Sequence, residues 1–246
     1  MVINNKQQKI IINADDFGCS SSVNHAIAQC FEKGLIHRTT IMTNTPYFDD
    51  AVRLADTCGF KRHVGLHLVL DEFTPLTDDI KNNPHFCNNG KFLKGWAGQM
   101  KNKIYLSHYD ISCIKEEIEA QMQAYCDSGF TLMHIDSHHL VHTSSPIIIS
   151  IVSKLALEYG FKSMRNVAIY HNDNIVKKLA KIYVRNIIEK NFITTKFFAP
   201  YNNYNTLLKD VEYMSHPDMF NDFIVDVVNR DTGDVVAFKR NMICFF

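Results

Sequence analysis

The first part of the chain alternates between two hydrophobic periods. Short apolar runs at residues 9–13, 38–44 and 64–70 predict strands. Between them, apolar residues at helical spacing over 20–34 and 45–59 predict two helices, each closed by a glycine. This strand–helix alternation favours a parallel sheet with right-handed crossovers.

The same alternation resumes after residue 110. Predicted helices cover 111–129, 145–160 and 173–192, and predicted strands cover the residues leading into His134, then 161–167, 194–199 and 211–217. The fold class is therefore α/β: a single, irregular (β/α) barrel-like domain with about seven parallel strands. The chain of 246 residues suits one such domain, spanning 1–246.

Residues 71–110 interrupt the alternation with many turn residues and no clear helix or strand. A segment of this length in a compact enzyme is usually functional, so we predict an insertion that forms a lid or a substrate wall. Trp96 is the aromatic residue predicted to contact a sugar, because the C–H face of a pyranose is apolar. The alternative is that the aromatic residues only anchor the insertion to the barrel.

Several predicted strands end in side chains that bind metals or move protons. Asp15 and Asp16 follow the first strand, His67 lies in the third, and His216 closes a late strand. The densest stretch is 134–142, with four histidines and one aspartate. Imidazole and carboxylate are usual ligands of a catalytic divalent cation. Because the carboxyl ends of barrel strands meet on one face, we predict a metal site there.

Each of these motifs also has a plainer interpretation. The chain has 12 histidines, so a run of them can arise by chance. Asp and Gly are ordinary turn residues, and a lone histidine in an apolar strand is more often a hydrogen-bonded core residue.

Side chains along an extended strand alternate between its two faces, so His134, Asp136 and His138 are predicted to lie on the same face.

Composition narrows the class of protein. Basic and acidic residues both number 26, so the formal net charge is zero, which argues against a nucleic-acid surface and suggests a neutral substrate. The N-terminal residues contain no apolar segment suited to a signal peptide, and the chain none suited to a membrane span. Seven scattered cysteines without a C-x-x-C pair are typical of a reducing compartment. We therefore expect a cytoplasmic protein without nucleic-acid or membrane partners.

Four motifs in order carry a resemblance to a known family. They are Asn-Ala-Asp-Asp-Phe-Gly at 13–18, Gly-Leu-His-Leu at 65–68, His-Ile-Asp-Ser-His-His at 134–139 followed by His142, and Met-Ser-His-Pro at 214–217. Together, over roughly residues 8–220, they resemble the YdjC-like carbohydrate deacetylases, the family of the chitooligosaccharide deacetylases. The resemblance implies an irregular (β/α) barrel with a divalent metal that removes acetyl groups from N-acetylated sugars.

The resemblance also implies roles for individual residues. By motif position, Asp16, His67 and His138 match the metal ligands. Asp15 matches the catalytic base and His216 the catalytic acid. The sequence does not fix the metal, for which magnesium and zinc are the leading candidates. The substrate would be a small carbohydrate, and a homodimer is left open.

For two further residues, we expect roles that do not depend on the resemblance. Arg165 falls near the end of its strand, where it could bind substrate, hold Asp15 in place or form an ordinary ion pair. Asp136 could orient a liganding histidine from behind. Two other function classes stay open: another barrel metal hydrolase acting on a phosphoester or cyclic amide, and a non-catalytic sugar-binding relative.

The end of the chain departs from the family pattern. Family members continue after the His-Pro motif with an Arg-rich stretch and a final helix, whereas residues 220–246 alternate valines with charged residues around an Asp-Thr-Gly-Asp turn. This pattern predicts a β-hairpin. The departure leaves the last barrel units in doubt, but not the motif residues.

Overall fold

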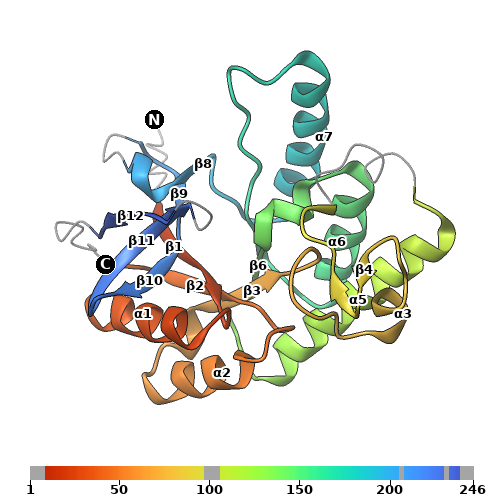
Figure 1. Ribbon diagram of the computed structural model, residues 1–246. Helices are drawn as coiled ribbons and strands as arrows, with labels where there is room; N and C mark the ends of the chain where they lie inside the picture. The colour runs from red at the N-terminus through yellow and green to blue at the C-terminus, as the bar shows by residue number, and fades with distance from the viewer. Residues whose placement is uncertain (1–8, 97–105, 205–207, 230–232, 239–246) are drawn as a thin grey trace.

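The computed structural model, which describes residues 9–96, 106–204, 208–229 and 233–238, is built on one curled sheet. Its strands are β1 (Ile10–Phe17), β2 (Arg38–Ile41), β3 (Val64–Leu68), β6 (His134–Ser137), β7 (Ser163–Met164), β8 (Phe197–Pro200) and β9 (Val211–Ser215). Their order is β7–β6–β3–β2–β1–β9–β8, and every neighbouring pair is parallel (Figure 1). The predicted α/β barrel-like fold with seven parallel strands is confirmed.

The sheet curls far enough for its two edges to approach. A parallel bridge joins Ser163 of edge strand β7 to Ile193, which lies shortly before the other edge strand, β8. The Met164 N–H donates to the Ile193 carbonyl at 3.1 Å, and the Ile193 N–H donates to the Lys162 carbonyl at 2.9 Å. These bonds occupy backbone groups that an open edge would leave unpaired.

Helices surround the sheet, and four of those described begin at a side-chain capping oxygen. They are α1 (Ser21–Glu32), α2 (Phe48–Thr57), α3 (Asp78–Lys81), α5 (His108–Asp127), α6 (Pro146–Glu158) and α7 (Ile175–Asn191), with 3₁₀ turns at Lys61–His63, His138–Thr143 and Tyr201–Asn203. Ser20, Ser107, Ser145 and Asn174 each accept a hydrogen bond from a backbone N–H in the first turn of the helix that follows. The predicted helix starts at Ser20 and at Ser145-Pro146 are confirmed.

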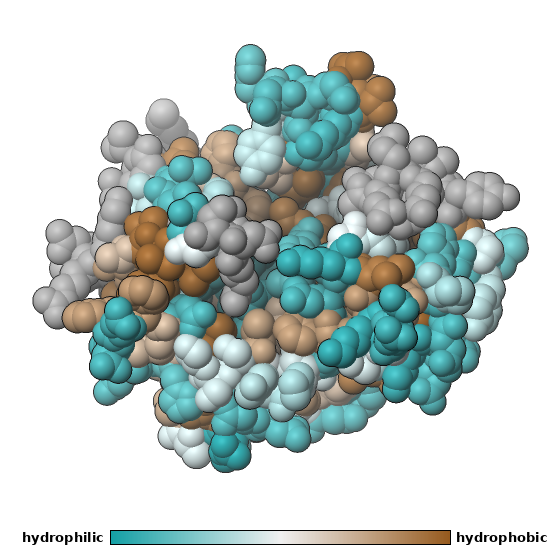
Figure 2. Space-filling view, in the orientation of Figure 1, coloured by the Kyte–Doolittle hydropathy of each residue, from teal (hydrophilic) through white to brown (hydrophobic). Residues whose placement is uncertain are grey.

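Helix α7 buries little of its apolar surface. Val184 and Ile188 face the core, whereas Ile175, Val176 and Leu179 are 60–72% exposed. The helix stands out from the sheet, and apolar residues gather at its tip (Figures 1 and 2). In the described part of the chain, no helix combines the length and the apolar character needed to cross a lipid bilayer.

The described residues of the 71–110 segment, which the sequence predicts to be an insertion, contain little regular structure before α5. They include α3 and a two-stranded antiparallel pair, β4 (Cys87–Asn88) and β5 (Lys91–Phe92). Residues 97–105 lie outside the described residues, so the predicted lid is described only in part.

A small antiparallel sheet follows the barrel. Its strands are β10 (Pro217–Phe220), β11 (Phe223–Asn229) and β12 (Asp234–Ala237). The predicted hairpin is confirmed by the β11–β12 pair, and β10 extends it to three strands. We call these three strands the C-terminal ribbon. It lies beside α1 (Figure 1), where the Ser22 hydroxyl donates to Asp218 at 2.5 Å.

Candidate active site

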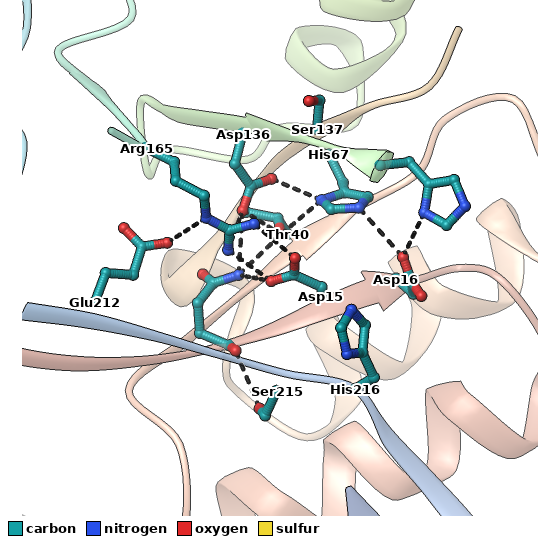
Figure 3. Close-up of polar contacts among 12 residues, drawn as sticks. Asp15, Asp16, Thr40, His67, Asp136, Ser137, Arg165, Glu212, Ser215 and His216 are labelled. Carbon is teal, nitrogen blue, oxygen red and sulfur yellow. Dashed lines mark hydrogen bonds and ion pairs between the residues drawn. The ribbon is translucent and has the colours of Figure 1, made fainter. Parts of the chain in front are cut away.

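The ends of four strands meet at one cavity of about 500 Å³. Asp15 and Asp16 reach it from β1, His67 from β3, His138 from the residue after β6, and His216 from the residue after β9. The strands that carry them are close neighbours in the parallel sheet, so their carboxyl ends lie together. The predicted cluster of side chains is thus assembled on one face of the barrel (Figure 3).

An irregularity in β1 turns two adjacent carboxylates toward the same cavity. In a regular strand, neighbouring side chains point to opposite faces. Here the β1–β2 register shifts between Ala14 and Phe17, and Asp16 has a φ of 67°. Aspartate tolerates this left-handed conformation better than most residues, and such strain is typical of functional sites. Asp15 and Asp16 therefore both line the cavity.

Asp16, His67 and His138 form a donor set that fits a divalent cation. Asp16 Oδ1 lies 3.2 Å from His67 Nε2 and 2.9 Å from His138 Nδ1. His67 Nε2 is buried and makes no hydrogen bond of good geometry. The other nitrogen of that ring, Nδ1, lies 2.7 Å from Asp136 Oδ1, so the lone pair on Nε2 can face a metal. A buried imidazole nitrogen that faces a carboxylate without a well-formed hydrogen bond is suited to bind a cation.

Two neighbouring groups of acids and histidines are less suited to a cation. Asp15 and Asp136 also lie close to His67, and Asp136 and Glu212 lie close to His134. In both groups the carboxylates are already bound by one guanidinium, that of Arg165. A cation there would have to displace a buried positive charge.

Arg165 is the centre of a buried ion-pair network. Its Nη1 and Nη2 donate to both oxygens of Asp15 at 2.6 Å, and its Nε donates to Glu212 at 2.7 Å. Nη2 also lies 2.7 Å from Asp136. Its side chain is completely buried and does not line the cavity. Of the alternatives open from the sequence, Arg165 holds Asp15 in place in this structure, and its contact with a substrate stays a prediction.

Comparisons with known proteins agree with this geometry. A family model described as YdjC-like protein matches residues 9–233. A carbohydrate deacetylase of Halalkalibacterium halodurans is 33% identical over 85% of this chain and 84% of its own. A carbohydrate deacetylase of Thermoanaerobacter pseudethanolicus is 29% identical over 89% and 84%.

The chain belongs to the YdjC-like protein family. Among solved structures, an Enterococcus faecalis protein for which cellobiose-phosphate cleavage has been proposed superimposes with a TM-score of 0.70 at 23% identity. That match covers 88% of this chain and 83% of the other, and it shows a shared fold.

The four histidines of the family motif divide into two kinds. His134 and His142 are buried away from the cavity and bond to Ser163 and Ser137. Burial lowers the pKa of both, that of His142 to about 4, which keeps the rings neutral. His138 and His139 line the cavity, and His139 is bonded to Asp71 at 2.8 Å.

The pKa values of the two imidazoles beside Asp16 shift the other way. Burial alone would lower the pKa of His67, but Asp136 raises it to about 9. Burial is likewise outweighed at His138, where Asp16 and Glu72 raise the pKa to about 10. Asp16 itself is buried, yet His138 holds its pKa well below the usual value. A cation bound here would have to replace these protons.

Several residues of this site were not anticipated from the sequence. Glu72 lines the cavity, and one of its oxygens lies 2.9 Å from His138 Nε2. Asn13 donates to Asp15 at 2.6 Å and to Asp136 at 3.2 Å, and so holds two carboxylates together. Both follow the same rule as the predicted residues, since Glu72 comes shortly after β3 and Asn13 lies two positions before Asp15. Glu212, inside an apolar strand, is itself a signal of a buried partner.

Trp96 is not placed where the sequence predicted. Its side chain is 1% exposed, packs edge-on against Phe86 with 4.7 Å between ring centroids, and donates its indole N–H to the Leu70 carbonyl. It anchors the insertion, which was the alternative interpretation. Among the described residues of the insertion, Glu72 and Lys94 line the cavity.

Replacing the buried guanidinium tests the ion-pair network. Arg165→Met leaves three buried carboxylates without their common counter-ion, so we expect a loss of about 3–5 kcal/mol in the free energy of unfolding, measured with urea. Arg53→Met is the matched control, because its pair with Asp50 is exposed and should be worth less than about 1 kcal/mol. Equal losses in the two variants would contradict a structural role for the network.

The pKa values predict how stability depends on pH without metal. His67 has a folded pKa of about 9, above its usual value of 6.5, so its stabilising effect is complete below about pH 6.5 and is lost as pH rises through 9. Chelator-treated protein should therefore melt at a lower temperature at pH 10 than at pH 7. His67→Gln should show a smaller change over that interval. Equal changes would mean that His67 carries no proton at neutral pH.

Proposed function

We propose that this chain is a metal-dependent carbohydrate deacetylase that hydrolyses the acetamido group of N-acetylated sugars or short oligosaccharides of the chitooligosaccharide type. The observation that carries the proposal is the cavity itself. It joins a three-residue donor set for a cation to a carboxylate and an imidazole that the donor set does not use. The names of the relatives in the YdjC-like family support the same activity.

One divalent cation would be held by Asp16, His67 and His138. When bound, it supplies Lewis acidity, which polarises the amide carbonyl and lowers the pKa of water. Two imidazoles suit zinc, and a carboxylate also suits magnesium. Asp136 orients the His67 ring, and Glu72 bonds to His138, so both rings are fixed before a substrate enters.

Asp15 is the proposed general base. Burial raises its pKa, but the guanidinium of Arg165 outweighs burial and holds the pKa below the usual value. The carboxylate is therefore ionised at neutral pH. Asn13 and Arg165 donate to its oxygens and fix its position, and it can accept a proton from the water that attacks the acetyl carbon.

His216 is the proposed general acid. It lies at the end of β9, half-buried, and lines the same cavity as Asp15. Figure 3 shows its ring near the two aspartates and apart from His67. In its protonated form it can donate to the sugar nitrogen as the C–N bond breaks, because an unprotonated amine is a poor leaving group. The products are acetate and a free amino sugar.

Measurements of metal binding should distinguish the roles of the adjacent histidines His138 and His139. His138→Ala removes a proposed ligand and should abolish stoichiometric binding of zinc, measured by calorimetry and elemental analysis. His139→Ala is the matched control, because its side chain is half-exposed and bonded to Asp71 instead of Asp16. We expect it to retain at least part of the metal. The reverse result would assign the ligand to His139.

Replacing the proposed acid or the proposed base should lower activity without loss of the bound metal. Asp15→Asn and His216→Ala should each lower the turnover of di-N-acetylchitobiose by about 10²–10⁴-fold, measured as acetate release, with bound metal near the wild-type level. Asp49→Asn and His25→Ala, both exposed, are the controls. Loss of metal in either variant would make that residue a ligand. Full activity of His216→Ala would remove the proposed acid.

A further inference from the structure

His216 is the junction between the barrel and the C-terminal ribbon. β9 ends at Ser215 and β10 begins at Pro217, so His216 alone connects them. Contacts from outside the barrel strand can therefore contribute to the orientation of His216.

The ribbon holds both backbone groups of His216. The His216 N–H donates to Asp226 Oδ1 at 2.6 Å, and the Val227 N–H donates to the His216 carbonyl at 2.9 Å. These two contacts come from adjacent residues of β11, and Val227 also lines the cavity. The main chain of His216 is thus fixed from two directions, and its ring faces the cavity.

Asp226 is an unusual residue for this position. It is 3% exposed and lies in an otherwise apolar run, and no ion pair among the described residues involves it. A buried carboxyl group is costly unless its oxygens are bonded. Its bond is to the N–H of His216, and burial raises the pKa of Asp226 while that bond lowers it. If residue 226 only had to pack within the strand, a valine, such as its neighbours Val225 and Val227, would be more favourable.

We propose that Asp226 is a positioning residue for His216, and that the C-terminal ribbon completes the active site by fixing the proton donor over the cavity. The inference rests on the proposed role of His216 as general acid. It assigns a function to the segment that follows the last barrel strand. The residue acts through the backbone of His216 and does not touch the substrate.

Two substitutions separate positioning from general stability. Asp226→Val keeps the volume and strand propensity but removes the acceptor, whereas Asp226→Asn keeps an acceptor oxygen. We expect Asp226→Val to lower kcat for di-N-acetylchitobiose by about 10- to 100-fold, with KM and bound metal unchanged, because a proton donor is misplaced. Asp226→Asn should stay within about threefold of wild type. Asp222→Asn removes an exposed carboxylate from the same ribbon and is the control.

Backbone hydrogen exchange gives a second measurement that does not depend on activity. The amide of His216 should lose protection in Asp226→Val and keep it in Asp226→Asn. Wild-type kcat in Asp226→Val, or a large loss in Asp226→Asn with the amide still protected, would overturn the inference. If Asp226→Val fails to fold, Asp226→Asn decides alone by the same two readings. If wild-type protein releases no acetate, the proposed function fails, whereas exchange at His216 still tests the contact.

Discussion

One buried guanidinium supports the chemistry of this site. Arg165 bonds to Asp15, Asp136 and Glu212, and Arg38 lies 2.6 Å from the second oxygen of Glu212. Two positive charges therefore compensate three carboxylates inside the barrel. Without them, burial would favour the protonated acids, and Asp15 would be a donor where the proposed reaction needs an acceptor. The ion pair with Arg165 also holds the Asp136 carboxylate beside His67 Nδ1.

The network also explains why two neighbouring clusters of acids and histidines are less suited to a cation than the cluster of Asp16, His67 and His138. Asp15 and Asp16 are adjacent in sequence, yet Arg165 binds the first and leaves the second to His67 and His138. The left-handed backbone at Asp16 makes this division possible, because it turns both side chains toward the cavity. The proposed base and the proposed metal ligand are thus adjacent in sequence but have different partners.

Sequence reasoning located the strand ends because they obey local rules. Asp15, Asp16, His67, His138 and His216 each follow or end a run of strand-forming residues, and parallel strands bring such positions together. The partners of these residues could not be located in the same way. Ion pairs across the barrel depend on the order of strands in the sheet, which spacing along the chain does not reveal.

Arg165 and Trp96 show what residue type alone does not reveal about the position of a side chain. Arginine and tryptophan both suit a binding surface, so residue type alone favoured a substrate contact for Arg165 and Trp96. In the fold, the guanidinium meets three carboxylates, and the indole fills the space between Phe86 and Leu70. Glu72 was missed for a different reason: although it comes shortly after β3, it lies in a segment with no periodic pattern, and its contact with His138 is not apparent from sequence.

The C-terminal ribbon lies outside the barrel, yet it positions a residue of the proposed active site. A barrel strand fixes the side chains along its length, but the residue after its end is free to turn. In this chain, the proposed acid occupies that free position, and β11 supplies the two bonds that hold it. Asp15 is fixed from inside the barrel by Arg165, and His216 is fixed from outside by Asp226. The two residues proposed to move protons are therefore positioned by separate structures.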